Sequence, residues 1–163
     1  MNNTPLTKHG YSLLKDELLK LKTIGRPEVI QAIAEARAQG DLSENAEYDA
    51  AKEKQGFIEG RIQELEAKIS TAHLIDPSLL EKDGRVVFGV WAKFVDLDND
   101  KKFVYQIVGD DEADINQNKI SVSSPIARAL IGKSEGDVAE FSVPSGKREV
   151  EILEVIYENS NKS

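Results

Sequence analysis

Apolar positions in the first half of the chain recur at the spacing of helices that pack side by side. Between residues 48 and 72 the seam positions follow alternating steps of three and four. They are Tyr48, Ala51, Gln55, Ile58, Ile62, Leu65, Ile69 and Ala72. About four heptads of this spacing predict a helix that packs one face against a partner helix. Gly56 and Gly60 lie within this helix, and we expect them to allow close approach of the partner helix.

The partner helix is predicted over residues 7–39, where three leucines recur at steps of four and three: Leu14, Leu18 and Leu21. Thr7 suits the N-cap position, and Gly40 suits the position after the last turn. The stretch 25–27, Gly-Arg-Pro, predicts a kink or a short interruption. A short connection between two long helices requires an antiparallel hairpin. Roughly 30 residues at 1.5 Å rise make a rod of about 45 Å.

From Pro77 the pattern changes to β-like runs. The runs cover residues 85–97, 102–109, 119–122, 138–143 and 148–157, with hairpin turns at 97–102 and 144–147. In the last run, Val150 and Ile152 alternate, and Val155 joins them after a slip. We therefore expect an α+β fold with two domains, a helical coiled-coil hairpin over 1–76 and an antiparallel sheet with one helix over 77–163.

The one helix predicted in the second half spans residues 124–133. Ser124 suits its N-cap, Pro125 its first turn and Gly132 its end. Trp91, the only tryptophan, falls in a β-like run, where a core position is the favoured interpretation.

The net charge of −8 bears on whether the protein binds DNA. Residues 1–76 carry 10 bases and 13 acids (−3), and residues 77–163 carry 11 and 16 (−5). Neither half favours sequence-independent DNA binding through phosphate neutralisation, and we expect no independent sequence-specific DNA binding. An acidic protein more naturally meets a basic protein surface or a cation.

The absence of cysteine excludes disulfides and thiolate zinc sites, and the two histidines, His9 and His73, exclude a His-rich metal site. The N-terminal sequence has no signal-peptide pattern, and no apolar run reaches about 18 residues. We expect a cytoplasmic monomer that has no membrane partner.

Five carboxylates and a single base, Arg37, lie between residues 35 and 49, where the two predicted helices meet. The acids are Glu35, Asp41, Glu44, Glu47 and Asp49. Asp41 and Glu44 match a capping box, with Ser43 as a competing N-cap. Carboxylate oxygens are also the ligands that Mg²⁺ prefers. Helix capping and metal binding both remain open from the residues alone.

Motifs in both halves carry a resemblance to a known family. "RPEVIQAIAEARAQGDLSENAEYDAAKEKQGFIEGRIQELEAKI" resembles the N-terminal coiled coil of the bacterial Gre-type transcript cleavage and elongation factors, in their GreA-like branch. "GRVVFG", "YQIVGDDEAD" and "ISVSSPIARALIGKSEGD" resemble their C-terminal domain. The resemblance covers about residues 5–157. It implies an FKBP-like C-terminal domain and binding to RNA polymerase through its secondary channel. There the protein would stimulate the polymerase's own cleavage of the 3′ end of backtracked nascent RNA.

The resemblance also implies roles for residues of the acidic tip at 40–45. Asp41 and Glu44 would hold a second Mg²⁺ jointly with the polymerase and orient the attacking water, and no ion is expected in the isolated protein. A two-metal site needs ions about 4 Å apart and an activated water, so one or two added carboxylates can complete it.

Four residues near the tip are candidates for contact with the RNA 3′ segment. Arg37 and Lys52 form a thin basic patch, although ion pairs with Glu35, Asp49 or Glu53 are an equal alternative. Asn45 would hold the turn or touch RNA, and Tyr48 would pack in the seam or touch nucleic acid.

In the second half, Ser123, Ser124 and Pro125 are the candidates for docking to the polymerase, with helix capping as the alternative. Two other functions remain open: a channel-blocking inhibitor of the polymerase, and a prolyl isomerase suggested by fold analogy alone. An isomerase needs an apolar, aromatic-lined pocket, which spacing alone does not show.

Overall fold

The computed structural model describes residues 3–41 and 45–157 of the chain. The chain divides into two compact units. The hairpin unit contains Met1–Thr4 and Ser12–Ala72, and the sheet unit contains Pro5–Tyr11 and His73–Ser163. The boundary thus assigns the short segment Pro5–Tyr11 to the sheet unit. The domain limits read from the sequence, 1–76 and 77–163, stay a prediction.

Helices α1 (Lys8–Lys20) and α2 (Arg26–Arg37) are joined by a π-helical turn, η1 (Leu21–Gly25). This turn is the interruption that the Gly-Arg-Pro stretch predicts, placed just before the proline. Thr7 caps α1 as expected, since its Oγ1 accepts a hydrogen bond from Gly10 N at 2.9 Å. Gly40 has a positive φ of +113°, which favours glycine, but it lies two residues beyond the C-cap, Ala38, so the position expected for it directly after the helix is wrong by one residue.

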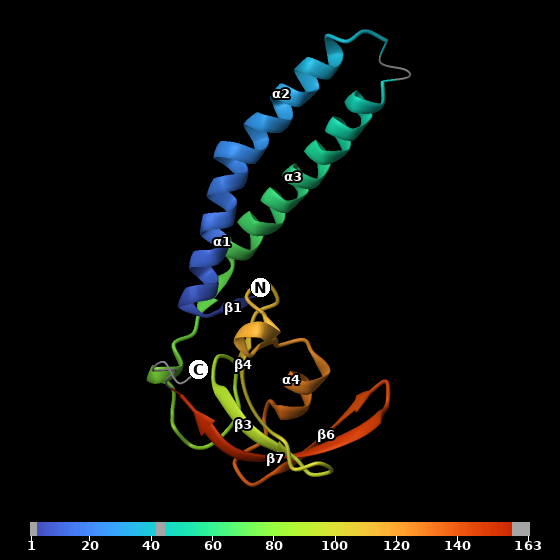
Figure 1. The fold of residues 1–163 in the computed structure, drawn as a ribbon. Coiled ribbons are helices and arrows are strands. Elements are labelled where there is room, and N and C mark those ends of the chain that lie inside the picture. Colours follow the sequence, from blue (N-terminus) through green and yellow to red (C-terminus); the bar gives the residue numbers. More distant parts are fainter. Residues whose placement is uncertain (1–2, 42–44, 158–163) are drawn as a thin grey trace. The chain divides into compact units, whose positions relative to one another are not determined.

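Helix α3 (Ala46–Ser70) lies beside α2, as Figure 1 shows. The middle of the predicted seam is confirmed: Ala51, Ile58, Ile62 and Leu65 are buried. Tyr48, Gln55 and Ile69 are only half-buried. The expected role of Gly56 and Gly60 is wrong, because a Cβ at either would meet nothing within 4 Å. Gly25 does face the partner helix, because a Cβ at this position would lie 3.7 Å from Ile58 Cδ1.

Ion pairs connect the two arms of the hairpin. The Arg26 guanidinium holds both carboxylate oxygens of Glu59 at 2.8 and 2.9 Å, and Arg61 holds Glu17 in the same way at 2.8 Å. The hydrogen bond from Arg26 keeps the pKa of Glu59 below its ordinary value. Exposed pairs contribute little stability individually. Their bidentate geometry does favour one register of the two helices.

Two three-residue strands, β1 (Thr4–Leu6) and β2 (Ala72–Leu74), form a small sheet of their own. Thr4 N donates to Thr71 O, and Ile75 N donates to Leu6 O, both at 2.8 Å. The sequence reading missed both strands and placed Ala72 in the helical seam.

The five-stranded sheet has the order β5-β4-β3-β7-β6. Its strands are β3 (Trp91–Asp96), β4 (Lys102–Val108), β5 (Lys119–Ser121), β6 (Val138–Val143) and β7 (Gly146–Ile156). Short 3₁₀ turns lie at Pro77–Leu79 and Ile115–Gln117. The α+β class is therefore confirmed, but the sheet is mixed and not purely antiparallel, because β5 runs parallel to β4.

The sheet curls around one side of α4 (Pro125–Leu130), as Figure 1 shows. Ala127 and Leu130 of this helix are fully buried in the core that the sheet forms. The slip predicted in the last strand is a β-bulge: Lys93 pairs with Glu154, and the next residue, Phe94, pairs with Ile152. The bulge keeps Val150, Ile152 and Val155 on the buried face.

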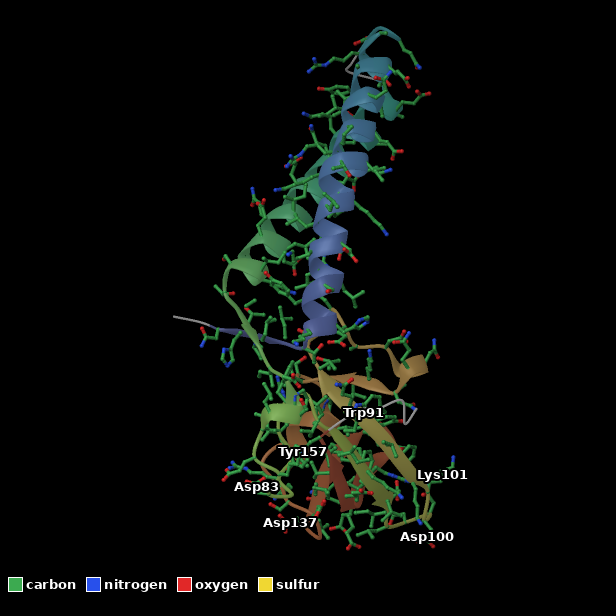
Figure 2. The ribbon with its side chains drawn as sticks, turned by 90° about the vertical axis from the view of Figure 1, so that its left-hand side faces the viewer. Asp83, Trp91, Asp100, Lys101, Asp137 and Tyr157 are labelled. Carbon is green, nitrogen blue, oxygen red and sulfur yellow. The ribbon has the colours of Figure 1, made fainter. Side chains whose placement is uncertain are left out.

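The predicted strand over 85–97 begins only at Trp91. Within this run Gly89 has φ +93°, a value that an extended strand does not adopt. Trp91 is buried as expected, and Figure 2 shows it among the side chains of the sheet unit. None of the helices in the part of the chain that the structure describes is long and apolar enough to cross a membrane.

Candidate functional site

Asn45 connects the two arms of the hairpin where they meet at the acidic segment. It is the N-cap of α3, and its Oδ1 accepts from Tyr48 N at 3.0 Å. Its Nδ2 donates to Ala36 O, near the end of α2, at 2.7 Å. The alternative that Asp41 caps α3 is therefore wrong, because the helix begins later. Ser43 lies outside the described residues. Of the two roles expected for Asn45, the structure shows that it holds the turn.

Asp41 is exposed, and it lies just after Gly40 in the segment that leaves α2. Glu44 lies outside the described residues, so the pairing of the two acids stays a prediction. Within the described ranges, no group of three or more acidic, histidine or cysteine side chains is placed to hold a metal ion. Asp41 offers the oxygen donor that Mg²⁺ prefers.

Glu47 and Asp49, two further acids of the segment, are exposed in the first turn of α3. The partial positive charge of a helix N-terminus favours acids there. Capping does not require them, since Asn45 already caps the helix. The partial positive charge of the helix N-terminus therefore explains the positions of Glu47 and Asp49. It does not explain Asp41, which lies outside the helix.

The predicted basic pair lines one groove on the hairpin. The Arg37 guanidinium lies over the Tyr48 ring, 5.9 Å from its centroid, and Lys52 Nζ donates to Gln55 Oε1 at 3.3 Å. The groove has a volume of about 240 Å³. Its lining is Ile30, Ile33, Ala34, Arg37, Lys52 and Gln55. Within the described ranges neither base forms an ion pair with a carboxylate, so the expected salt bridges are not found there.

The sequence reading missed Gln55 as a groove residue, because its seam position suggested packing alone. Gln55 is only half-buried, and its amide oxygen reaches the Lys52 ammonium. A polar residue in an otherwise apolar seam was the available signal. It marks a point where the seam opens to solvent.

The three predicted docking residues lie at the start of α4. Ser124 caps the helix, since its Oγ accepts from Ala127 N at 3.2 Å. Ser123 is exposed and donates to Asp110 Oδ1 at 2.9 Å, and Ser121 Oγ donates to the same oxygen. Pro125 is exposed in the first turn. The capping alternative is thus confirmed for Ser124, while docking stays a prediction for all three residues.

The sheet unit also holds a pocket of about 270 Å³ with aromatic walls. Phe94, Phe103 and Tyr105 contribute rings whose centroids lie 5.5 to 5.7 Å apart. The sequence could not show this aromatic lining, which is one feature that the isomerase alternative requires. A pocket alone does not define a function.

Comparison with known proteins places the whole chain in one family. The family model described as "Transcription elongation factor, N-terminal" matches residues 4–74, and "Transcription elongation factor, GreA/GreB, C-term" matches residues 81–157. The chain is 63% identical over 157 residues to transcription elongation factor GreA of Ralstonia nicotianae, covering 96% of this chain and 99% of that protein. It is 61% identical to GreA of Neisseria meningitidis serogroup B, with the same coverage.

A solved structure, GreA factor homolog 1 of Thermus thermophilus, is 29% identical with a TM-score of 0.42, covering 94% of this chain and 99% of that one. The identities and the two matched models show that this chain belongs to the GreA/GreB family of transcription elongation factors. Membership at this identity favours neither the channel-blocking inhibitor nor the prolyl isomerase.

Proposed function

We propose that this protein binds bacterial RNA polymerase through its secondary channel and stimulates the Mg²⁺-dependent cleavage of backtracked nascent RNA. The observation that carries the proposal is the exposed carboxylate of Asp41, at the end of a helical hairpin, in a chain of the GreA/GreB family. Release of the RNA 3′ end would return an arrested elongation complex to synthesis. The protein needs no active site of its own for this, because the polymerase supplies the reaction centre.

Asp41 and Glu44 would contribute carboxylate oxygens to an ion shared with the polymerase. When bound, a second Mg²⁺ lowers the pKa of an attacking water and neutralises charge on the phosphate. Asp41 is exposed and so can approach a partner's active site without unfolding the hairpin. A donor set of one or two carboxylates binds Mg²⁺ weakly on its own. We therefore expect ion binding only in the complex.

The groove that holds Arg37 and Lys52 would receive the displaced RNA segment. Both cations line it, and neither is paired with a described carboxylate, so each can meet a phosphate. The Arg37 guanidinium lies over the Tyr48 ring, which would also offer a face for a base to stack on. Two cations make a weak electrostatic contact, which suits an RNA end that binds transiently.

Docking would use the surface at the start of α4. The exposed Ser123 and Pro125 lie beside the capped first turn. The hydrogen bonds from Ser121 and Ser123 to Asp110 hold this loop in one conformation. A preformed loop loses less entropy on binding than a mobile one. We expect the protein to bind polymerase as a monomer.

An arrested elongation complex of a bacterial RNA polymerase tests the proposal. Asp41→Asn and Glu44→Gln should abolish stimulated cleavage while polymerase affinity stays unchanged. Asp49→Asn is the matched control, because it removes the same charge from an exposed acid in the first turn of α3. It should leave cleavage within about twofold of wild type. Full activity of Asp41→Asn would refute the carboxylate role, and inhibition of synthesis without cleavage would indicate a channel blocker instead.

A further inference from the structure

The groove on the hairpin unit is built from both arms with the same spacing. Helix α2 contributes Ile30, Ala34 and Arg37, and helix α3 contributes Lys52 and Gln55, at steps of three or four residues. Side chains at these steps lie on one face of a helix, so each arm presents a row of them to the groove. All five residues belong to the hairpin unit, and the groove is therefore defined within that unit alone.

The floor of the groove is apolar and partly open to solvent. Ile33 is buried, whereas the side chain of Ile30 is 52% exposed and Ala34 is also exposed. The volume of about 240 Å³ lies just below the range of drug-sized sites, which is about 300–1,000 Å³. The groove therefore suits one planar ring system and is too small for a folded segment of a partner.

The polar side chains of the groove offer hydrogen-bond donors. The Lys52 ammonium and the Arg37 guanidinium carry donors only. Lys52 Nζ donates to Gln55 Oε1 at 3.3 Å, so the amide oxygen faces the ammonium and the amide NH₂ group is the part of Gln55 that can serve a ligand. A ring on the apolar floor would thus meet two neighbouring donors, one from Lys52 and one from Gln55.

Two neighbouring donors match one RNA base better than the others. Guanine presents two adjacent acceptors, N7 and O6, on one edge, whereas adenine places an amino donor beside N7 and cytosine presents an amino donor. Uracil presents a single acceptor, O4, on the corresponding edge. Unstacked bases of single-stranded RNA expose these edges to side chains, and grooves that bind single strands combine such contacts with cations for the backbone.

We propose that this groove is a subsite for one unstacked guanine of the displaced RNA, with its ring on the apolar floor and its O6 and N7 facing Lys52 and Gln55. The inference rests on the proposed function, which brings RNA to the hairpin, and adds a base preference to it. Arg37 takes no part in the hydrogen bond between Lys52 and Gln55, and it serves the neighbouring phosphate. Gln55 is therefore the residue that sets specificity.

The direct test uses the full-length protein and RNA alone. Isotope-labelled protein is titrated with hexauridylate and with three hexanucleotides in which guanosine, adenosine or cytidine replaces one internal uridine. Shifts of the Gln55 side-chain amide signals report binding, and their concentration dependence gives Kd. The oligonucleotide with guanosine should bind at least about fivefold more tightly than each of the other three. Any other order of affinities, or no shift at Gln55 with any of the four, would overturn the proposal.

Three substitutions separate the roles of the groove residues. Gln55→Leu keeps the size of the side chain and should reduce the preference for guanosine to within about twofold. Arg37→Gln should weaken the binding of all four oligonucleotides alike and keep the preference, because it removes a phosphate contact. Gln63→Leu, the same change at an exposed position of α3 that does not line the groove, is the matched control and should alter neither quantity. A full preference for guanosine in Gln55→Leu would refute the role of the amide.

The functional readout uses an arrested elongation complex with guanosine or uridine at each displaced position in turn. At the position that meets the groove, the ratio of stimulated cleavage rates, guanosine over uridine, should be about fivefold higher with wild type than with Gln55→Leu. Equal ratios for the two proteins at every position would refute the subsite. If wild type stimulated no cleavage at all, the proposed function would fail, and the oligonucleotide affinities would still decide on the groove.

Discussion

Asn45 is the residue whose loss should most weaken the junction between the arms of the hairpin. Asn45→Ala removes the cap on Tyr48 N and the hydrogen bond to Ala36 O. Loss of an N-cap costs about 1 kcal/mol. Loss of a second hydrogen bond costs about 1 kcal/mol more. A total near 2 kcal/mol corresponds to local opening that is roughly 30-fold more frequent.

Hydrogen exchange of the Tyr48 and Asp49 amides measures this opening, because both amides lie in the first turn of α3. Asn45→Asp keeps the oxygen that accepts from Tyr48 N but loses the donor to Ala36 O, so its effect should be intermediate. Lys54→Ala, an exposed change within the same helix, is the control. If exchange in Asn45→Ala rose by less than about threefold, the assigned role of the side chain in joining the arms would be refuted.

Two further predictions concern stability. Leu65→Ala removes a fully buried seam residue and should destabilise the hairpin by about 3 kcal/mol in urea unfolding followed by circular dichroism; Phe57→Ala, at a position that is 71% exposed, should stay within about 0.5 kcal/mol of wild type. Burial raises the pKa of Tyr157, whose hydroxyl accepts a hydrogen bond from Gly84 N at 2.9 Å. Figure 2 labels Tyr157 and Asp83 in the sheet unit. The folded state therefore favours the neutral phenol. Below pH about 10, the free energy of unfolding of wild type should exceed that of Tyr157→Phe by about 1 kcal/mol. This difference should disappear as the pH rises through the raised pKa of the folded state. An advantage that grew with pH would contradict this assignment.

The long periodic elements were predictable because each buries one face along its whole length. The seam from Tyr48 to Ala72 predicted α3, and the alternation of Val150, Ile152 and Val155 predicted both β7 and its bulge. The role predicted for Gly56 and Gly60, close approach of the partner helix, was wrong because their heptad positions point away from that helix. The seam spacing already contained that information.

The short elements were not predictable for a physical reason. β1 and β2 have three residues each, too few to show a period of two, and their pairing depends on segments far apart in the chain. The parallel direction of β5 is a property of the tertiary fold that leaves no mark on three residues.

The candidate site was likewise predictable only in part. Residue types and the family resemblance identified Asp41, Arg37 and Lys52. They could not show that Arg37 stacks on Tyr48 or that Asn45 Nδ2 donates to Ala36 O, because both contacts cross between the arms of the hairpin.

The central claim is that this chain lends a carboxylate to the Mg²⁺ site of RNA polymerase. It is tested most directly by the Mg²⁺ dependence of cleavage in an arrested elongation complex, measured without the protein, with wild type and with Asp41→Asn. We expect wild type to lower the Mg²⁺ concentration for half-maximal cleavage. Asp41→Asn should bind the polymerase but leave that concentration at the value found without the protein. The same Mg²⁺ dependence for wild type and Asp41→Asn would contradict the account.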